Sequence, residues 1–174
     1  MKRLLYNAAL HALLPFLPLR LWWRGRKEPL YRADIGQRFG RYAERPSKPV
    51  IWVHAVSLGE TRAAQPLVRA LAQRYPDHQL VITHMTATGR ETARQLYGED
   101  AMLAFLPYDF PWAVARFMEH FRPRLGVLME TEIWFNLVRA AEVRGIPMLL
   151  ANARLSEKSA RGYRRAGPLI REAL

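Results

Sequence analysis

The feature that most constrains the fold is a regular alternation, after residue 49, of short apolar segments with longer amphipathic ones. The short segments are apolar on both faces, as are strands buried on both sides of a parallel sheet. Five such strands are predicted, at 50–55, 79–84, 102–107, 124–129 and 147–152. Four helices are predicted between them, at 60–75, 89–97, 111–121 and 133–144.

Strands that alternate with helices indicate βαβ units joined by right-handed crossovers. The sequence therefore predicts an α/β fold over residues 49–174, with a Rossmann-like open parallel sheet and flanking helices. In the helix predicted at 60–75, the spacing places Ala63, Leu67, Ala70 and Leu71 on one buried stripe. Residues 155–174 are predicted to form one more helix, interrupted near Gly167 and Pro168.

Length and composition favour one folded domain. A chain of 174 residues, half of them hydrophobic, is long enough for one substantial core. The absence of cysteine excludes disulfides, thiolate metal sites and a cysteine nucleophile, and it suits a reducing compartment.

Positive charge is concentrated at the N-terminus. The chain carries a net charge of +12, and residues 1–48 hold eleven Lys or Arg against three Asp or Glu, which is a net of +8. A block this basic favours an anionic partner such as nucleic acid, anionic lipid or a phosphorylated substrate. A well-solvated surface is the alternative.

Residues 1–30 are predicted to form an amphipathic helical segment that associates with a membrane, followed by a connector at 31–48. The stretch from Leu4 to Trp23 is long enough to span a bilayer, but prolines and polar residues interrupt it. Aromatic rings followed by cations are typical of an interfacial segment. The residues concerned are Trp22, Trp23, Arg24, Arg26 and Lys27. A core helix pair and a single anchoring span are the alternatives, and a removable signal peptide is not expected.

Polar residues follow each predicted strand. In an open parallel sheet, ligands bind beyond the carboxyl ends of the strands, so these turns are the place to look for a site. The turns contain Ser57, Gly59 and Glu60, then Thr86, Thr88 and Gly89, then Asp109, and then Glu130 and Glu132. Ser57, Thr88 and Asp109 have an alternative role as helix caps.

Glu60 is the candidate with the clearest chemistry. It follows a glycine at a strand-to-helix turn, where unpaired N–H groups and the helix dipole favour an ionised carboxylate. An ionised carboxylate at the rim of the sheet can accept a proton from a substrate hydroxyl. A structural glutamate in the first helical turn remains the alternative.

Several common sites are absent from the sequence. It has neither the P-loop nor the dinucleotide-binding glycine pattern, which argues against NTP hydrolysis and NAD chemistry. The segment THMTATG offers hydroxyls and helix N–H groups suited to an anion or a sugar. His54 and His84 end adjacent strands, but no third ligand is regularly spaced with them, so no metal is predicted.

Four motifs together carry a family resemblance. They are WVHAVSLGE at 52–60, the T-x-T-G turn at 86–89, LPYDFPWAV around Asp109, and METEIWFN at 129–136. In these motifs the chain resembles the N-terminal half of the Kdo (3-deoxy-D-manno-octulosonic acid) transferases, which build the inner core of lipopolysaccharide. The resemblance implies a GT-B glycosyltransferase, with two Rossmann-like domains and the active site between them.

The resemblance also implies substrates and location. Family members transfer Kdo from CMP-Kdo to a bisphosphorylated lipid A precursor without a metal or other cofactor, at the cytoplasmic face of the inner membrane. Residues 49–174 would then be the acceptor-binding domain, and the donor-binding domain would be absent from this chain. We expect the chain to be inactive without it.

Residue roles follow from the matching motifs. Glu60 would be the catalytic base for an inverting transfer, supported by Ser57, Gly59, Asp109, Glu130 and Glu132. Apart from the motif roles, Thr86, Thr88 and Gly89 are candidates to bind the acceptor or its anionic groups, because their turn suits an anion or a sugar. Arg62 is a candidate for the same role by charge and position alone. The family motif usually has proline where this chain has Phe135.

Two other functional classes remain open. One is a non-enzymatic membrane-associated module that binds a phosphorylated ligand at the rim of the sheet. The other is a nucleic-acid-binding domain attracted by charge, although the sequence contains no recognition motif for nucleic acid.

Overall fold

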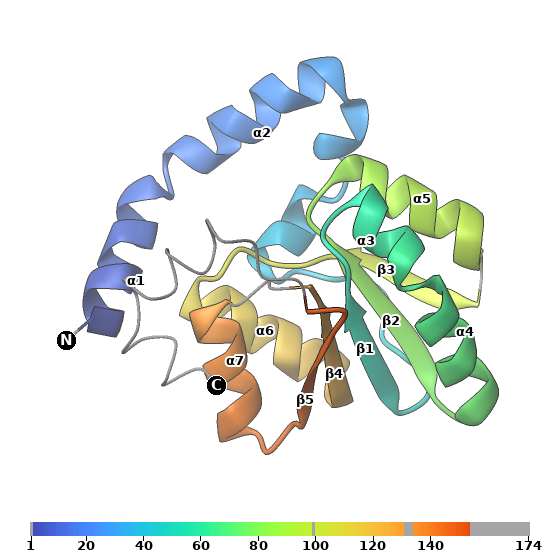
Figure 1. The fold of residues 1–174 in the computed structure, drawn as a ribbon. Helices are drawn as coiled ribbons and strands as arrows, with labels where there is room; N and C mark the ends of the chain where they lie inside the picture. The colour runs from blue at the N-terminus through green and yellow to red at the C-terminus, as the bar shows by residue number, and fades with distance from the viewer. Residues whose placement is uncertain (1, 99, 131–133, 154–174) are drawn as a thin grey trace.

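The computed structural model describes residues 2–98, 100–130 and 134–153. Within them, five parallel strands form one sheet in the order β3-β2-β1-β4-β5, flanked by helices (Figure 1). The strands are β1 (Val50–His54), β2 (Gln79–His84), β3 (Ala101–Phe105), β4 (Pro123–Met129) and β5 (Met148–Ala151). The predicted α/β class with an open parallel sheet is confirmed.

In the described part of the chain, the helices after β1 lie in the connections between successive strands. On one face of the sheet lie α3 (Leu58–Ala63), α4 (Gln65–Arg74) and α5 (Ala87–Tyr97). On the other lie α6 (Pro111–Phe121) and α7 (Phe135–Val143). The helix predicted over 155–174 lies outside the described residues.

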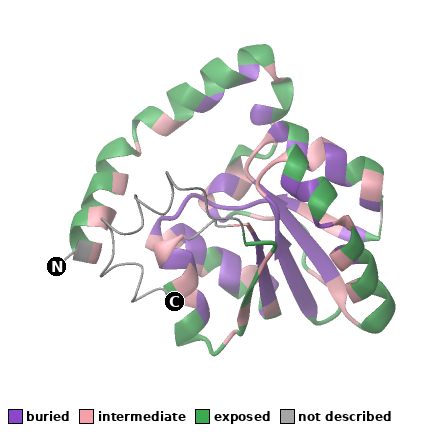
Figure 2. Cartoon of the chain, in the orientation of Figure 1, coloured by how far each residue is buried: buried purple, intermediate pink, exposed green. Residues whose placement is uncertain are grey.

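The central strand β1 is buried on both faces, as the purple strands in Figure 2 show. On the α6 side, Trp52 packs edge-on against Phe117, with ring centroids 5.0 Å apart. On the α4 side, Ile51 and Val53 pack with Val68. Burial on both faces explains why the sequence of this strand is continuously apolar rather than alternating between apolar and polar residues.

The helix predicted over 60–75 is two helices. Ala64 ends α3 and precedes α4, and Pro66 occupies the first turn of α4, where its missing N–H costs no helical hydrogen bond. The predicted stripe is half right. Leu67 and Leu71 pack against the core, whereas Ala63 and Ala70 are exposed, and Ala64 and Val68 are the buried residues.

Two helices precede the sheet and leave much apolar surface exposed. α1 (Lys2–Leu13) and α2 (Phe16–Lys27) meet at an angle of 55° around Pro15. Leu21 is buried against Tyr108 and Phe110, which attaches α2 to the body of the protein. Among the described residues no single helix has the length and hydropathy of a membrane span, whereas the bent pair taken together does.

The segment after α2 contains two short 3₁₀ helices, η1 (Pro29–Tyr31) and η2 (Ile35–Phe39). This segment covers the edge strand β3, since the Gln37 Oε1 accepts a hydrogen bond of 2.8 Å from the Phe105 N–H. The Tyr42 hydroxyl donates to the Phe105 carbonyl at 3.0 Å. These contacts satisfy polar backbone groups of an edge that would otherwise be open.

Phe117 should be one of the residues on which the sheet–helix packing depends. Its side chain is fully buried beside Trp52. Phe117→Ala should lower the free energy of unfolding by about 3–5 kcal/mol, because it removes buried surface and leaves a cavity. Denaturant unfolding measures the loss, and Val143→Ala, at a site 66% exposed, should change it by less than about 0.5 kcal/mol. Equal effects of the two substitutions would contradict this packing.

Candidate active site

Glu60 is held by a reciprocal cap at the start of α3. Ser57 is the N-cap residue, and its Oγ accepts a hydrogen bond of 3.4 Å from the Glu60 N–H. The Glu60 carboxylate accepts in return from the Val56 N–H at 2.8 Å and from the Ser57 hydroxyl at 2.9 Å. This is a variant of the capping box, in which a glutamate reaches back to an N–H group ahead of its own helix and to the N-cap hydroxyl.

The environment of Glu60 raises its pKa above the ordinary glutamate value. Burial is the largest cause, since the residue is only 7% exposed, and the nearby charge of Glu130 acts in the same direction. The hydrogen bonds from Val56 and Ser57 oppose the rise without cancelling it. The sequence-based expectation that this turn favours the ionised form is therefore corrected: burial outweighs the local N–H groups.

The turns after β1 and β2 pack directly against each other. Thr86 is the N-cap of α5, accepting from the Gly89 N–H at 3.1 Å and donating to the Val56 carbonyl at 3.1 Å. A Cβ on Gly89 would lie 3.2 Å from Val56 O and from the Ser57 backbone. Glycine therefore permits the close approach that places the T-x-T-G turn beside Glu60. Thr88, an expected cap, is exposed and does not cap the helix.

Glu130 lies at the carboxyl end of β4, the strand next to β1. Its backbone is left-handed, with φ of 58°, and its N–H donates to the Ala151 carbonyl at 2.8 Å. The charge of Glu130 helps to raise the pKa of Glu60, so the two carboxyl groups interact. Glu132 lies outside the described residues.

Asp109 is a cap, but not of the helix that follows it. It is 1% exposed, and its carboxylate accepts from the backbone N–H groups of Asn136 and Leu137, both at 3.0 Å, in the first turn of α7. The Tyr6 hydroxyl of α1 also donates to it, at 2.9 Å. The alternative role of Asp109 as a helix cap is therefore supported, although the helix it caps is α7; α6, which follows Asp109 in the chain, has no side-chain cap.

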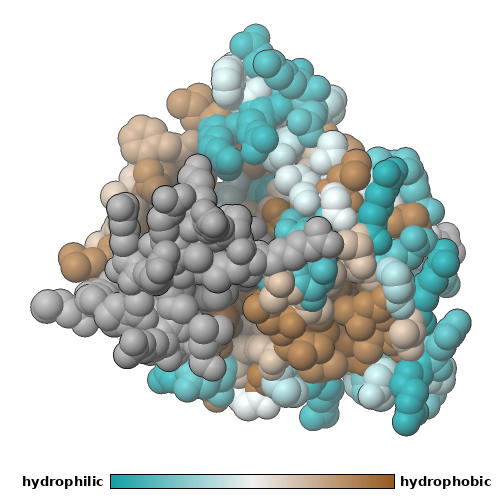
Figure 3. Space-filling model, in the orientation of Figure 1, coloured by the Kyte–Doolittle hydropathy of each residue, from teal (hydrophilic) through white to brown (hydrophobic). Residues whose placement is uncertain are grey.

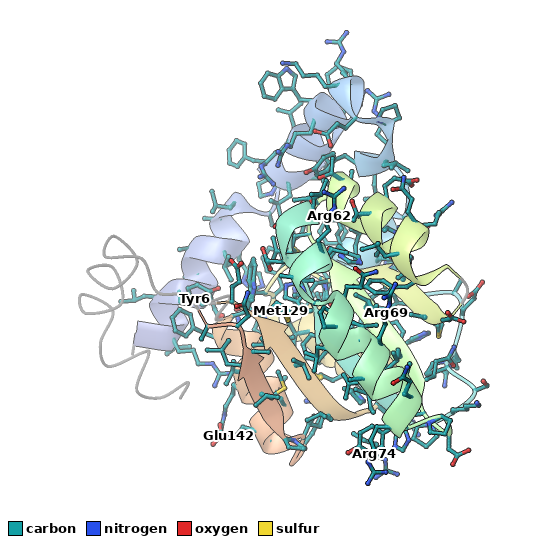
Figure 4. The ribbon with its side chains drawn as sticks, turned by 45° about the vertical axis from the view of Figure 1, so that its right-hand side comes forward. Tyr6, Arg62, Arg69, Arg74, Met129 and Glu142 are labelled. Atoms are coloured by element: carbon teal, nitrogen blue, oxygen red, sulfur yellow. The ribbon has the colours of Figure 1, made fainter. Side chains whose placement is uncertain are left out.

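Asp109 therefore connects the N-terminal helix to the rim of the sheet. Asn136 extends the connection, donating from Nδ2 to Asn7 Oδ1 at 2.8 Å and accepting from Arg3 Nε at 3.4 Å. Burial raises the pKa of Asp109 to about 6, although hydrogen bonds from Asn136, Tyr6 and Leu137 lower it. The Tyr6 ring also packs edge-on against Phe135 of α7, with ring centroids 5.2 Å apart; Figure 4 labels Tyr6 on α1.

Other candidates lie on the surface around this rim. Arg62 is exposed on α3, below α2 in Figure 4, and Gly59 is exposed with ample space for a side chain. Trp22 and Trp23 are 50% and 65% exposed on α2, and the Arg26 guanidinium lies 4.9 Å from the Trp22 ring centroid. Arg24 and Lys27 are exposed in the last turn of the same helix.

His54 and His84 form no metal centre with the other described residues. His54 Nδ1 contacts Thr83 O at 3.1 Å and Thr83 Oγ1 at 2.9 Å, whereas His84 Nδ1 donates to Ala55 O at 2.8 Å. Among the described residues, no group of three or more potential ligands from His, Cys, Asp and Glu has the geometry for a metal ion. Both rings are fully buried, and each leaves its Nε2 without a partner in the part of the chain described.

A separate hollow of about 660 Å³ lies at the opposite end of the sheet. Its lining includes Val50 and Pro123, the first residues of β1 and β4, together with Arg45 and Arg124. Because the capped turns lie at the carboxyl ends of these strands, this hollow is not the site that contains Glu60.

Comparison with known proteins identifies the family. Residues 33–174 match the family described as 3-deoxy-D-manno-octulosonic-acid transferase (kdotransferase). This chain belongs to the Kdo transferase family.

Individual relatives agree with this assignment. A 3-deoxy-D-manno-octulosonic acid transferase of Bordetella pertussis is 45% identical over all of this chain and 42% of its own length. The Haemophilus influenzae enzyme of the same name is 38% identical over 94% of this chain and 39% of its length. A probable mitochondrial 3-deoxy-D-manno-octulosonic acid transferase of Arabidopsis thaliana is 35% identical over 95% of this chain and 37% of its own length. The chain thus spans about two-fifths of the length of these relatives.

The sequence did not predict the roles of two side chains, Tyr6 and Arg38. Tyr6 lies in a leucine-rich helix and gave no sign that it contacts Asp109, 103 positions later. Arg38 is one arginine among many in a basic segment, yet it is 1% exposed. No local pattern distinguishes a buried arginine from its exposed neighbours, so tertiary packing is the signal that identifies it.

The buried histidines should make the fold acid-sensitive. Burial lowers the pKa of His54 to about 3 and that of His84 to about 4, so both are neutral in the folded protein near pH 7. The unfolded chain binds these protons below about pH 6.5, and stability is lost as the pH falls from there toward 4. His54→Asn retains a donor near Thr83. It should reduce the slope of the free energy of unfolding against pH by about 1.4 kcal/mol per pH unit.

Denaturant unfolding between pH 7 and pH 4.5 measures the two slopes. Asp109 contributes a pH dependence of the opposite sign, because its raised pKa makes ionisation costly as the pH rises toward 6. Wild type and His54→Asn share that contribution from Asp109, so it cancels when their slopes are compared. Identical slopes in wild type and His54→Asn would show that His54 is not held neutral by the fold.

Proposed function

We propose that this chain is the acceptor-binding half of an enzyme that transfers Kdo from CMP-Kdo to a lipid A precursor, with Glu60 as general base. The observation that carries the proposal is the geometry of Glu60. Its carboxylate is fixed at the carboxyl end of the sheet by Val56 and Ser57, and its pKa is raised. A base with a pKa closer to neutral accepts a proton more effectively than an ordinary glutamate, provided it remains ionised.

In the proposed reaction, the acceptor hydroxyl gives its proton to a Glu60 oxygen. The hydroxyl oxygen then forms a bond to the anomeric carbon of Kdo from the face opposite the leaving group. The bond from that carbon to CMP breaks, its electron pair leaves with CMP, and the configuration inverts. We propose that the donor is bound by a second Rossmann-like domain outside this chain and that no metal ion takes part.

The residues around Glu60 have supporting roles in this proposal. Ser57 and the Val56 N–H fix the carboxylate, so little reorganisation accompanies proton transfer. Thr88 and Arg62 are exposed beside the cap, where a hydroxyl and a cation suit a sugar phosphate. Thr86 and Gly89 shape the turn, and Glu130, Glu132, Asp109 and Gly59 complete the proposed active-site set.

The N-terminal helices suit a membrane surface, and we propose that they lie on the cytoplasmic face of the inner membrane. Figure 3 shows hydrophobic atoms along the outer side of α1 and α2 next to hydrophilic atoms at the end of α2. Exposed side chains include Leu5, Phe16 and Leu19, each more than 60% exposed. Aromatic and aliphatic side chains beside cations are typical of an interfacial helix on anionic lipid. On this view residues 1–30 are the membrane segment and 31–48 connect it to the acceptor-binding domain.

Replacing Glu60 distinguishes an enzyme that uses this residue as its base from a non-enzymatic binding module. In a full-length transferase that contains this chain, Glu60→Gln should lower kcat by about 10²–10⁴-fold, the usual contribution of a general base. The amide keeps an acceptor oxygen for the Val56 N–H, so acceptor binding should change little. Steady-state transfer and equilibrium acceptor binding are measured side by side.

Glu119→Gln is the matched control, because Glu119 lies beside the hollow at the other end of the sheet. It should leave transfer unchanged. Full transfer activity in Glu60→Gln would reject Glu60 as the base.

The membrane proposal is tested on vesicles. The double substitution Trp22→Ala and Trp23→Ala should weaken binding to vesicles containing phosphatidylglycerol by at least tenfold, because it removes two exposed interfacial rings. Cosedimentation over a salt series measures the loss, and Tyr75→Ala, which removes an aromatic ring 41% exposed outside these helices, is the control. Tighter binding to duplex DNA than to vesicles at the same salt concentration would favour the nucleic-acid alternative instead.

A further inference from the structure

A second hollow, of about 600 Å³, lies between η2 and the first turns of α6. It is lined by Ile35, Gly36, Phe39, Arg41, Trp112 and Arg116. The first four come from η2 and the residues after it, and the last two come from α6. This volume falls within the range of about 300–1,000 Å³ that is usual for small-molecule sites. The hollow therefore has room for a ligand.

The two walls of this hollow are held together by backbone packing at Gly40. Its backbone is left-handed, with φ of 74°, and a Cβ at this position would clash with the Ala113 carbonyl oxygen. Glycine thus allows the end of η2 to pack directly against α6. The Tyr108 N–H, in the turn before α6, also donates to the Arg38 carbonyl of η2 at 2.9 Å. The shape of the hollow is therefore set by the fold.

The surface of the hollow is largely apolar. The rings of Phe39 and Trp112 are nearly parallel, with planes 6° apart and centroids 6.2 Å apart. Both side chains are only partly buried, so they present aromatic surface to the hollow. Ile35, which is 38% exposed, adds aliphatic surface. A recess of this kind suits a hydrocarbon chain.

Two arginines border this apolar surface. Arg41 and Arg116 are exposed, and the Arg116 guanidinium lies 5.2 Å from the centroid of the Trp112 ring. In the described part of the chain, neither guanidinium forms an ion pair with a carboxylate. The described lining contains no Asp or Glu, and Asp34 of the same segment is paired with Arg90 at 2.6 Å. The positive charge at this hollow therefore favours an anionic group.

The hollow adjoins the inner side of the N-terminal helices. Phe39 and Trp112 belong to the same apolar cluster as Leu10, Leu14 and Leu17, which lie around the bend between α1 and α2. The outer side of these helices is the surface proposed above to lie on a membrane. An anionic phospholipid of that membrane carries both groups that the hollow suits, an acyl chain and a phosphate.

We propose that this hollow binds a single anionic phospholipid. Phe39, Trp112 and Ile35 contact an acyl chain, while Arg41 and Arg116 bind the phosphate. A lipid bound here adds a second attachment to the leaflet beside the N-terminal helices, and two linked attachments bind more tightly than either alone. That role at the membrane rests on the proposed function, whereas lipid binding by the hollow does not.

The site is tested first without a membrane, in the full-length transferase. Phosphatidylglycerol with two hexanoyl chains, kept below its micelle-forming concentration, should bind. Phosphatidylcholine with the same chains should bind about tenfold more weakly, because its head group has no net charge. Replacing both arginines, Arg41→Gln with Arg116→Gln, should weaken phosphatidylglycerol binding by about tenfold to a hundredfold, the loss expected for charge-assisted hydrogen bonds. Isothermal titration calorimetry measures these affinities.

A matched pair of substitutions controls for the loss of charge. Arg69→Gln with Arg74→Gln removes two exposed cations from α4 (Figure 4) and should leave the affinity within about twofold of wild type. Ile35→Asp changes an exposed side chain, so it should fold, and it should weaken binding by placing a carboxylate in the hollow. Thermal unfolding verifies that each variant is folded.

Three results would overturn the site. They are equal affinity for the two short-chain lipids, equal loss of binding in the two double-arginine variants, and unchanged binding in a folded Ile35→Asp variant. Competition by a soluble acidic peptide as strong as that by phosphatidylglycerol would also overturn it, because the hollow would then recognise charge without a hydrocarbon chain.

Vesicles distinguish this site from the proposed membrane helices. Arg41→Gln with Arg116→Gln should reduce the preference for phosphatidylglycerol over phosphatidylcholine vesicles by about tenfold. Unchanged vesicle binding by this variant, together with loss of the short-chain lipid, would overturn the role at the membrane. Unchanged vesicle binding by Trp22→Ala with Trp23→Ala would instead contradict the proposed membrane helices, and it would leave the affinity of the hollow for the short-chain lipid intact.

Discussion

The pairing of β1 with β2 and β4 at the centre of the sheet is the constraint on which the other features depend. Residues 50–54 are buried on both faces, and the strand forms parallel ladders with both neighbours. Because the three strands run in the same direction, their carboxyl ends meet at one edge. That edge brings together the turn of Glu60, the turn of Thr86 and the turn of Glu130, which are up to 70 positions apart in the chain.

The chemistry proposed for Glu60 depends on a balance between burial and hydrogen bonding. The same Ser57 that caps α3 also donates to the carboxylate, so helix formation and the position of the base are coupled. Burial and Glu130 raise the pKa, whereas Val56 and Ser57 limit the rise. A structural cap and a general base are therefore compatible roles for one glutamate, since each carboxylate oxygen has a second lone pair.

The N-terminal helices are attached to the sheet by polar contacts as well as by apolar packing. Tyr6 and Asn7 of α1 reach Asp109 and Asn136, the residues that organise the start of α7. On α2, Leu21 packs into the body while Trp22 and Trp23 remain exposed. A surface that suits lipid is thereby fixed beside the proposed active site.

Local patterns in the sequence determined the parallel α/β sheet and the rim on which Ser57, Thr86 and Glu60 lie, because strand hydrophobicity and turn residues act over a few positions. Tertiary structure decided what those patterns do not encode. It divided the helix after β1 at Ala64, turned Asp109 toward α7 rather than α6, raised the pKa of Glu60 through burial, and left Arg38 buried without a carboxylate. The physical reason is the distance along the sequence over which each effect acts. A periodic pattern of a few residues indicates which face of a helix or strand is buried. Desolvation and the pairing of polar groups depend on atoms from distant segments, which meet only in the folded chain.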